Sequence, residues 1–139
     1  MEQLIEFATN NFMLIVAWVL TLLMIMWSES QKAGKSVSPA VATQLMNKQD
    51  AVLIDIRSKK EWDTGHITGS KHVPLADFSR RLQEVEKFKT RPVIVVCNMG
   101  QTAGAASKQL KAAGFDNVLR LQGGITEWKG QNLPIVKKA

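Results

Sequence analysis

The single cysteine of the 139-residue chain, Cys97, is the side chain best suited to covalent chemistry. It ends the apolar run VIVVC at residues 93–97, and a short loop containing a glycine follows. Backbone N–H groups in such a strand-to-helix loop, together with the positive end of the helix, stabilise an anion. If that anion is the Cys97 thiolate, the sulfur is a nucleophile at neutral pH. Alternatively, Cys97 is a small buried apolar residue that ends a strand.

The loop after the cysteine offers neutral groups to such an anion. Gly100 permits a backbone turn that a β-carbon would obstruct. Thr102 carries a hydroxyl that can donate to the sulfur or cap the following helix. The candidate binding loop consists of Asn98, Met99, Gly100, Gln101 and Thr102, none of which is charged.

Composition narrows the chemistry further. Cysteine and histidine supply only Cys97, His66 and His72, so a closed four-ligand zinc site lacks ligands and no disulfide can form within the chain. An unpaired thiol suits a reducing compartment. Residues 36–139 carry sixteen Lys and Arg against nine Asp and Glu, a net charge of +7. This charge attracts anionic lipid or anionic substrates, and no motif accompanies it that would predict nucleic-acid binding.

The elements that must position Cys97 alternate between strands and helices. Short apolar runs at residues 51–56, 93–97 and 118–121 predict strands, the first of them buried on both faces of a sheet. Strands that alternate with helices pair in parallel, which predicts an α/β fold. Because ligands bind beyond the carboxyl ends of parallel strands, Cys97 lies where chemistry is expected.

Three helical patterns lie around these strands. The first begins with Ser38 as N-cap and Pro39 at the first helical position, with Val41, Leu45 and Met46 as its apolar side. The second has apolar residues at steps of three and four, which is typical of an amphipathic helix. The third is rich in alanine and stops at a glycine. The predicted helices cover residues 38–47, 75–88 and 102–113.

The N-terminal segment differs from the rest of the chain. Residues 7–28 are uncharged, and as a helix they would span about 33 Å against a hydrocarbon core of about 30 Å. We therefore expect a tail and one transmembrane helix within residues 1–28, a polar linker at 29–35 and the folded domain at 36–139.

The charges that flank this segment predict its orientation. A cleaved signal peptide is disfavoured because Glu2 and Glu6, and no basic residue, precede the apolar stretch. Lys32 and Lys35 follow it, so the positive-inside rule predicts a single-pass protein with its C-terminal domain in the cytoplasm.

Further motifs occur in order along the folded domain. Before the cysteine stand D-I-R, E-W, G-H-I-T-G-S and V-P, and after it stand G-G-I, a tryptophan and L-P. They resemble the N- and C-terminal signatures of the rhodanese family, and an N-terminal anchor before one such domain resembles the small membrane-bound rhodaneses of bacteria. The motifs occupy residues 55–57, 61–62, 65–70, 73–74, 123–125, 128 and 133–134.

The resemblance implies a rhodanese-like open parallel sheet of about five strands flanked by helices. It also implies a sulfurtransferase of the bacterial inner membrane. The loop cysteine of the family takes a sulfane sulfur from thiosulfate, a polysulfide or a persulfide, and passes it to a thiol or another nucleophile. On this sequence the persulfide forms on Cys97, residues 98–102 supply the N–H cradle, and no metal or cofactor is required. The implied partners are a small sulfur donor, a thiol acceptor and a protein sulfur acceptor.

The loop departs from the commoner family pattern in its charge. Many active members carry Arg or Lys there, which attracts an anionic donor, whereas the neutral loop with Met99 suits a polysulfide, a small persulfide or a protein partner better. Related phosphatases have an arginine where this chain has Ala103, so phosphate ester hydrolysis is not expected. The alternative function is a catalytically weak, membrane-tethered rhodanese-like module that binds protein partners.

Other polar and aromatic residues of the motifs are expected to have structural roles. Asp55 and Arg57 follow a buried strand and should brace the fold through hydrogen bonds. His66 lies in a turn with no nucleophile near it in sequence, which favours a structural role over that of a general base. Trp62 and Trp128 are interpreted as packing residues.

Overall fold

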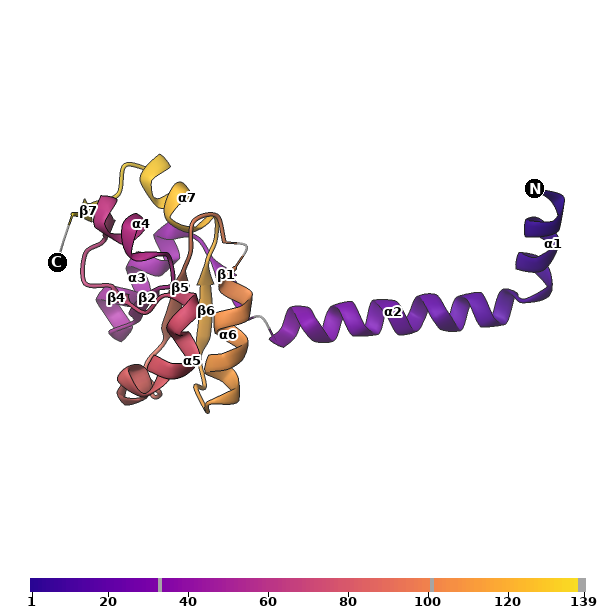
Figure 1. Ribbon diagram of the computed structural model, residues 1–139, viewed down its shortest axis with the longest axis horizontal. Helices are drawn as coiled ribbons and strands as arrows, with labels where there is room; N and C mark the ends of the chain where they lie inside the picture. The colour runs from indigo at the N-terminus through magenta and orange to yellow at the C-terminus, as the bar shows by residue number, and fades with distance from the viewer. Residues whose placement is uncertain (33, 101, 138–139) are drawn as a thin grey trace. The chain divides into compact units, whose positions relative to one another are not determined.

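The computed structural model describes residues 1–32, 34–100 and 102–137 (Figure 1). The chain divides into two compact units, Met1–Gln31 and Lys32–Ala139, and each is described by itself.

The N-terminal unit contains two helices, α1 (Glu2–Asn10) and α2 (Phe12–Lys32). Large apolar side chains along α2 are exposed from Phe12 to Trp27. Among the described residues, no single helix is long and apolar enough to cross a membrane, whereas the bent pair Glu2–Asn10 and Phe12–Ser28 meets that test jointly, with an 80° bend.

This bend interrupts the continuous helix predicted over residues 7–28. Asn11 stands between the two helices with φ −118°, outside the helical region, and its side-chain amide donates to the carbonyl of Phe7 at 2.9 Å. Asparagine side chains compete in this way with the backbone hydrogen bonds of a helix. The hydrogen bond from the Asn11 side chain therefore interrupts the helix that the surrounding apolar residues predict.

The predicted linker at residues 29–35 is mostly regular structure. Residues 29–32 continue α2, because the Glu, Gln and Lys in this stretch favour a helix. Strand β1 already begins at Lys35 and runs over Lys35–Val37. Gly34 has φ +85°, and a β-carbon there would lie 2.9 Å from the carbonyl oxygen of Val118. Ala33 lies outside the described residues.

The second unit is built on a five-stranded sheet that contains β1, β2 (Val52–Asp55), β4 (Lys71–His72), β5 (Val93–Val96) and β6 (Val118–Leu121). The strands lie in the order β1-β6-β5-β2-β4, and every pair is parallel (Figure 1). This confirms the predicted α/β architecture. All residues of the central strands β2 and β5 are buried, as expected for strands that are covered on both faces.

Side chains that alternate along β5 divide the core into two layers. Val93, Val95 and Cys97 belong to one cluster. The same cluster contains buried apolar residues of α5 (Phe78–Arg81), η2 (Leu82–Phe88) and α6 (Ala103–Ala112). Ile94 and Val96 belong to the other cluster, with residues of α3 (Pro39–Gln49) and α7 (Gly124–Gly130). Cys97 therefore ends the central strand on the face that α6 covers.

Two of the predicted helices form with small differences. Helix α3 (Pro39–Gln49) begins at Ser38, whose side chain accepts the N–H of Val41, and continues two residues beyond its predicted end. Val41 itself is exposed, which is contrary to expectation, whereas Pro39 and Ala42 are buried. Helix α6 (Ala103–Ala112) ends before Gly114, which has φ +98°, as predicted.

The predicted helix over residues 75–88 is instead a series of short turns. It consists of the 3-10 helix η1 (Leu75–Asp77), the α-helix α5 (Phe78–Arg81) and the 3-10 helix η2 (Leu82–Phe88). Buried Val85 and Phe88 are three residues apart, and a 3-10 helix with three residues per turn keeps such residues on one face.

Short elements complete the domain. Helix α4 (Lys59–Thr64) follows β2, and α7 (Gly124–Gly130) follows β6. Strands β3 (His66–Ile67) and β7 (Ile135–Val136) pair in an antiparallel manner and bring the C-terminal end of the described chain to α4 and its following turn.

Candidate active site

Cys97 lies directly after β5, at the carboxyl end of the parallel sheet, and is 2% exposed. Its Sγ accepts a hydrogen bond from the backbone N–H of Gly100 at 2.8 Å. A backbone N–H is a fixed donor, and it stabilises negative charge on sulfur better than it stabilises a neutral thiol. The geometry therefore suits a sulfur anion at this position.

Gly100 reaches the sulfur through a conformation that favours glycine. Its φ is +86°, in the left-handed region, and a β-carbon would lie 3.3 Å from the backbone nitrogen of Gly123 and 3.6 Å from the carbonyl oxygen of Leu121. The turn expected at Gly100 is confirmed.

The N-terminal turn of α7 holds the start of the cysteine loop. Ile125 N–H donates to the carbonyl of Cys97 at 2.8 Å, and Thr126 N–H donates to the carbonyl of Asn98 at 3.0 Å. Gly124 allows this approach, because a β-carbon there would stand 2.2 Å from the Cys97 carbonyl oxygen. Both carbonyls are engaged by α7, so the loop is oriented by an element 26 or more residues further along the chain.

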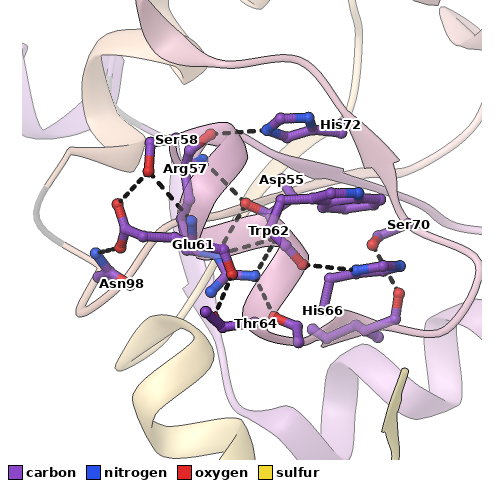
Figure 2. Close-up of polar contacts among 12 residues, drawn as sticks. Asp55, Arg57, Ser58, Glu61, Trp62, Thr64, His66, Ser70, His72 and Asn98 are labelled. Carbon is purple, nitrogen blue, oxygen red and sulfur yellow. Dashed lines mark hydrogen bonds and ion pairs between the residues drawn. The ribbon is translucent and has the colours of Figure 1, made fainter. Parts of the chain in front are cut away.

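The side chain of Asn98 contacts α4 (Figure 2). Its amide Nδ2 donates to Oε2 of Glu61, while Ser58 Oγ donates to Oε1 of the same carboxylate at 3.0 Å. The hydrogen bond from Asn98 is the largest cause that lowers the pKa of Glu61, with smaller contributions from Ser58 and the positive charge of Arg57, against desolvation, which raises it. Glu61 is therefore an ionised partner of the loop at neutral pH.

The other predicted loop residues have different positions. Met99 is 63% exposed beside the site. The carbonyl of Thr102 accepts the N–H of Ala105. Its side chain makes no capping hydrogen bond to the described part of α6, so the prediction that its hydroxyl caps this helix was wrong. Gln101 lies outside the described residues. Gly100 is the predicted cradle residue whose N–H the described structure places on the sulfur.

A buried ion pair supports the loop between β2 and α4. Arg57 Nη2 and Asp55 Oδ2 are 2.8 Å apart, and both side chains are at most 2% exposed. Arg57 also donates to the carbonyl of Gly65 at 2.7 Å, and its own carbonyl is 2.9 Å from Nε2 of His72. These bonds confirm that Asp55 and Arg57 brace the fold.

Trp62 is stacked between two histidine rings (Figure 2). The His66 ring lies parallel to it at a centroid distance of 3.5 Å, and the His72 ring lies on it at 4.7 Å. Nδ1 of His66 is 3.0 Å from the Trp62 carbonyl oxygen, and His66 is buried. The structural roles expected for His66 and Trp62 are confirmed. Trp128 is also buried, and its Nε1 donates to the Pro134 carbonyl at 3.0 Å.

Two features of the site were not predicted from the sequence. Glu61 contacts the loop, and the only sign in the sequence was the spacing of Ser58 and Glu61, which is typical of a capping box at a helix start. Gly124 supports the loop, and the pair of glycines indicated a close backbone approach without revealing which segment approaches.

Comparisons with known proteins agree with this arrangement. The sequence-family model of the rhodanese-like domain matches residues 38–131 of the chain. An uncharacterized protein of Escherichia coli K12, YibN, is 33% identical over 99% of both chains. Thiosulfate sulfurtransferase GlpE of Pseudoalteromonas translucida is 34% identical over 70% of this chain and 90% of its own length.

A solved structure shares the fold. The rhodanese-related protein of Thermoplasma volcanium superposes with a TM-score of 0.67 over 75% of this chain and 99% of its own, at 23% identity. With the cysteine at the end of the central strand and the family match over most of the folded unit, the chain belongs to the rhodanese-like domain family.

Proposed function

We propose that the protein is a sulfurtransferase that carries a sulfane sulfur on Cys97 as a persulfide. The observation that carries the proposal is the buried Sγ at the end of the central strand, 2.8 Å from the N–H of Gly100. Membership of the rhodanese-like family and similarity to a protein named thiosulfate sulfurtransferase support it.

The proposed reaction consists of two displacements at sulfur. The Cys97 thiolate attacks the sulfane sulfur of a donor, a new S–S bond forms, and the donor bond breaks with its electron pair leaving on sulfite or on a thiolate. An acceptor thiolate then attacks the outer sulfur of the Cys97 persulfide and releases the Cys97 thiolate. The bond that breaks supplies the leaving electron pair each time, so the cycle needs no oxidant or reductant.

The chain assists this chemistry by stabilising anions. The N–H of Gly100 donates to Sγ from a position set by the backbone, so this N–H group needs no rearrangement when negative charge develops on the sulfur. The contacts of α7 with the carbonyls of Cys97 and Asn98 keep the loop in this conformation.

Intact-protein mass spectrometry tests the proposal. The full-length protein in detergent is exposed to thiosulfate or to cysteine hydropersulfide, beside a Cys97→Ser variant whose fold is checked by circular dichroism. We expect the mass of one sulfur atom to be added, to be removed by a thiol, and to be absent from Cys97→Ser. If neither donor adds sulfur to a folded protein, the proposal is overturned and the tethered binding module is the better interpretation.

We also propose that residues 1–28 tether the protein to the bacterial inner membrane, with the C-terminal domain in the cytoplasm. The exposed apolar side chains of α2 and the basic Lys32 and Lys35 that follow support this. The protein should remain with membranes after high-salt and alkaline washes, whereas a variant lacking residues 2–28 should be released. Release of the full-length protein by salt would contradict the tether.

A further inference from the structure

Glu61 presents a fixed negative charge to the cysteine loop from α4 (Figure 2). Asn98 Nδ2 and Ser58 Oγ donate to its two carboxylate oxygens, which holds the group beside the residue that follows Cys97. Its lowered pKa keeps it ionised at neutral pH.

A second carboxylate stands near the loop from α7. A β-carbon placed on Gly123 would lie 2.5 Å from Cβ of Glu127 and 3.5 Å from its Oε2. Gly123 is in turn the backbone neighbour of Gly100, whose β-carbon would lie 3.3 Å from the Gly123 nitrogen. Gln131 Nε2 donates to Oε1 of Glu127 at 2.9 Å and restrains the group without neutralising it.

Two described cations close to Glu61 in the chain, Arg57 and Lys59, form ion pairs with other carboxylates. The Arg57 guanidinium is buried and paired with Asp55. Lys59 pairs with Asp63 at 3.1 Å. The loop residues themselves are uncharged. Within the described residues neither Glu61 nor Glu127 forms an ion pair, and Arg57, whose charge helps to lower the pKa of Glu61, is itself paired with Asp55.

We propose that the carboxylates of Glu61 and Glu127 make Cys97 selective for sulfur donors with at most one net negative charge, such as cysteine hydropersulfide, over the dianion thiosulfate. This selectivity rests on the proposed function. In the favoured step the Cys97 thiolate attacks the outer sulfur of R–S–SH, which yields the Cys97 hydropersulfide and the thiolate R–S⁻. Thiosulfate would bring two charges toward the same carboxylates, and the repulsion acts before any bond forms.

The test compares rates of sulfur addition to Cys97 from thiosulfate and from cysteine hydropersulfide, followed by intact mass in the full-length protein. Replacing Glu61 by glutamine keeps an oxygen that Asn98 can bind and removes the charge. We expect Glu61→Gln to raise the thiosulfate rate about 3- to 10-fold relative to the hydropersulfide rate. Glu127→Gln should also raise the thiosulfate rate relative to the hydropersulfide rate, and the double variant should raise it more than either single variant.

The matched control is Asp63→Asn on the same helix, because Asp63 is paired with Lys59 instead of with the loop. It should leave the ratio of the two rates unchanged. A merely structural role of Glu61 would change both rates together, so an unchanged ratio in Glu61→Gln overturns the selectivity. Failure of both donors to load the wild-type protein instead overturns the proposed function, which separates the two results.

Discussion

Gly124 lies against the carbonyl oxygen of Cys97, so closely that a β-carbon at position 124 would stand 2.2 Å from that oxygen. The contact lets the N–H of the next residue, Ile125, reach the same carbonyl at 2.8 Å. The conformation of the proposed catalytic loop thus depends on a glycine that follows Cys97 by 27 positions.

Gly124→Ala should therefore destabilise the fold and disturb the loop. The clash involves backbone atoms, and φ at this residue is +59°, so we expect a loss of about 2–4 kcal/mol in the free energy of unfolding. Denaturant unfolding measures the loss, and the mass assay should show slower sulfur addition. Gly130→Ala is the control, since nothing lies within 4 Å of a β-carbon there. Equal stability of the two variants would contradict this account.

The ion pair of Asp55 and Arg57 should be costly to break. Asp55→Ala would leave the Arg57 guanidinium buried without its carboxylate, so we expect a loss of about 3–5 kcal/mol in unfolding free energy. Asp63→Ala removes a partner from the exposed pair with Lys59 and should cost at most about 1 kcal/mol. Urea unfolding of both variants measures the difference. A similar small loss for both would show that Asp55 does not brace the fold.

Asn98→Ala should raise the pKa of Glu61 toward its ordinary value, because the hydrogen bond from Asn98 is the main cause that lowers it. A titration of the Glu61 carboxyl carbon by NMR measures the change. Glu84 is an internal control, since the hydrogen bond from Arg81 lowers its pKa and the variant leaves that bond intact. An unchanged Glu61 titration would show that the Asn98 contact is absent in solution.

The same shift predicts how stability depends on pH. A lowered pKa in the folded protein means that Glu61 stabilises the fold above its unfolded pKa, and that this stabilisation is lost as the pH falls through the lower folded value. Glu61→Gln should remove this contribution. The variant and the wild type should therefore differ in stability at neutral pH and converge in acid, as measured by denaturant unfolding at a series of pH values. A constant difference would refute the linkage.

The stack of His66, Trp62 and His72 should tolerate another aromatic ring better than its loss. Trp62→Ala empties the space between two rings and should cost about 3–5 kcal/mol in unfolding free energy. Trp62→Phe retains a stacked ring and should cost clearly less. Thermal unfolding of both variants distinguishes them. Equal losses would indicate that Trp62 stabilises the domain through contacts other than the stack.

Local patterns in the sequence were sufficient for much of this fold. The apolar runs predicted β2, β5 and β6, because a strand buried on both faces needs apolar residues at successive positions. Ser38 and Pro39 located the start of α3, since capping depends on neighbouring residues alone. The position of Cys97 at the end of β5 followed from the same patterns. Asn11 and the 3-10 turns after Pro74 were missed, because there a local hydrogen bond or a three-residue spacing prevailed over the general pattern.

The surroundings of the sulfur were decided only by the tertiary structure. Glu61 and Asn98 are 37 residues apart, and neither residue type indicates the other as its partner. Gly124 meets Cys97 because α7 packs at the carboxyl end of the sheet, which depends on how all the layers assemble. The nucleophile was thus determined by its local sequence. The charges around it were set by contacts between distant segments, whose geometry follows from the packing of the whole domain.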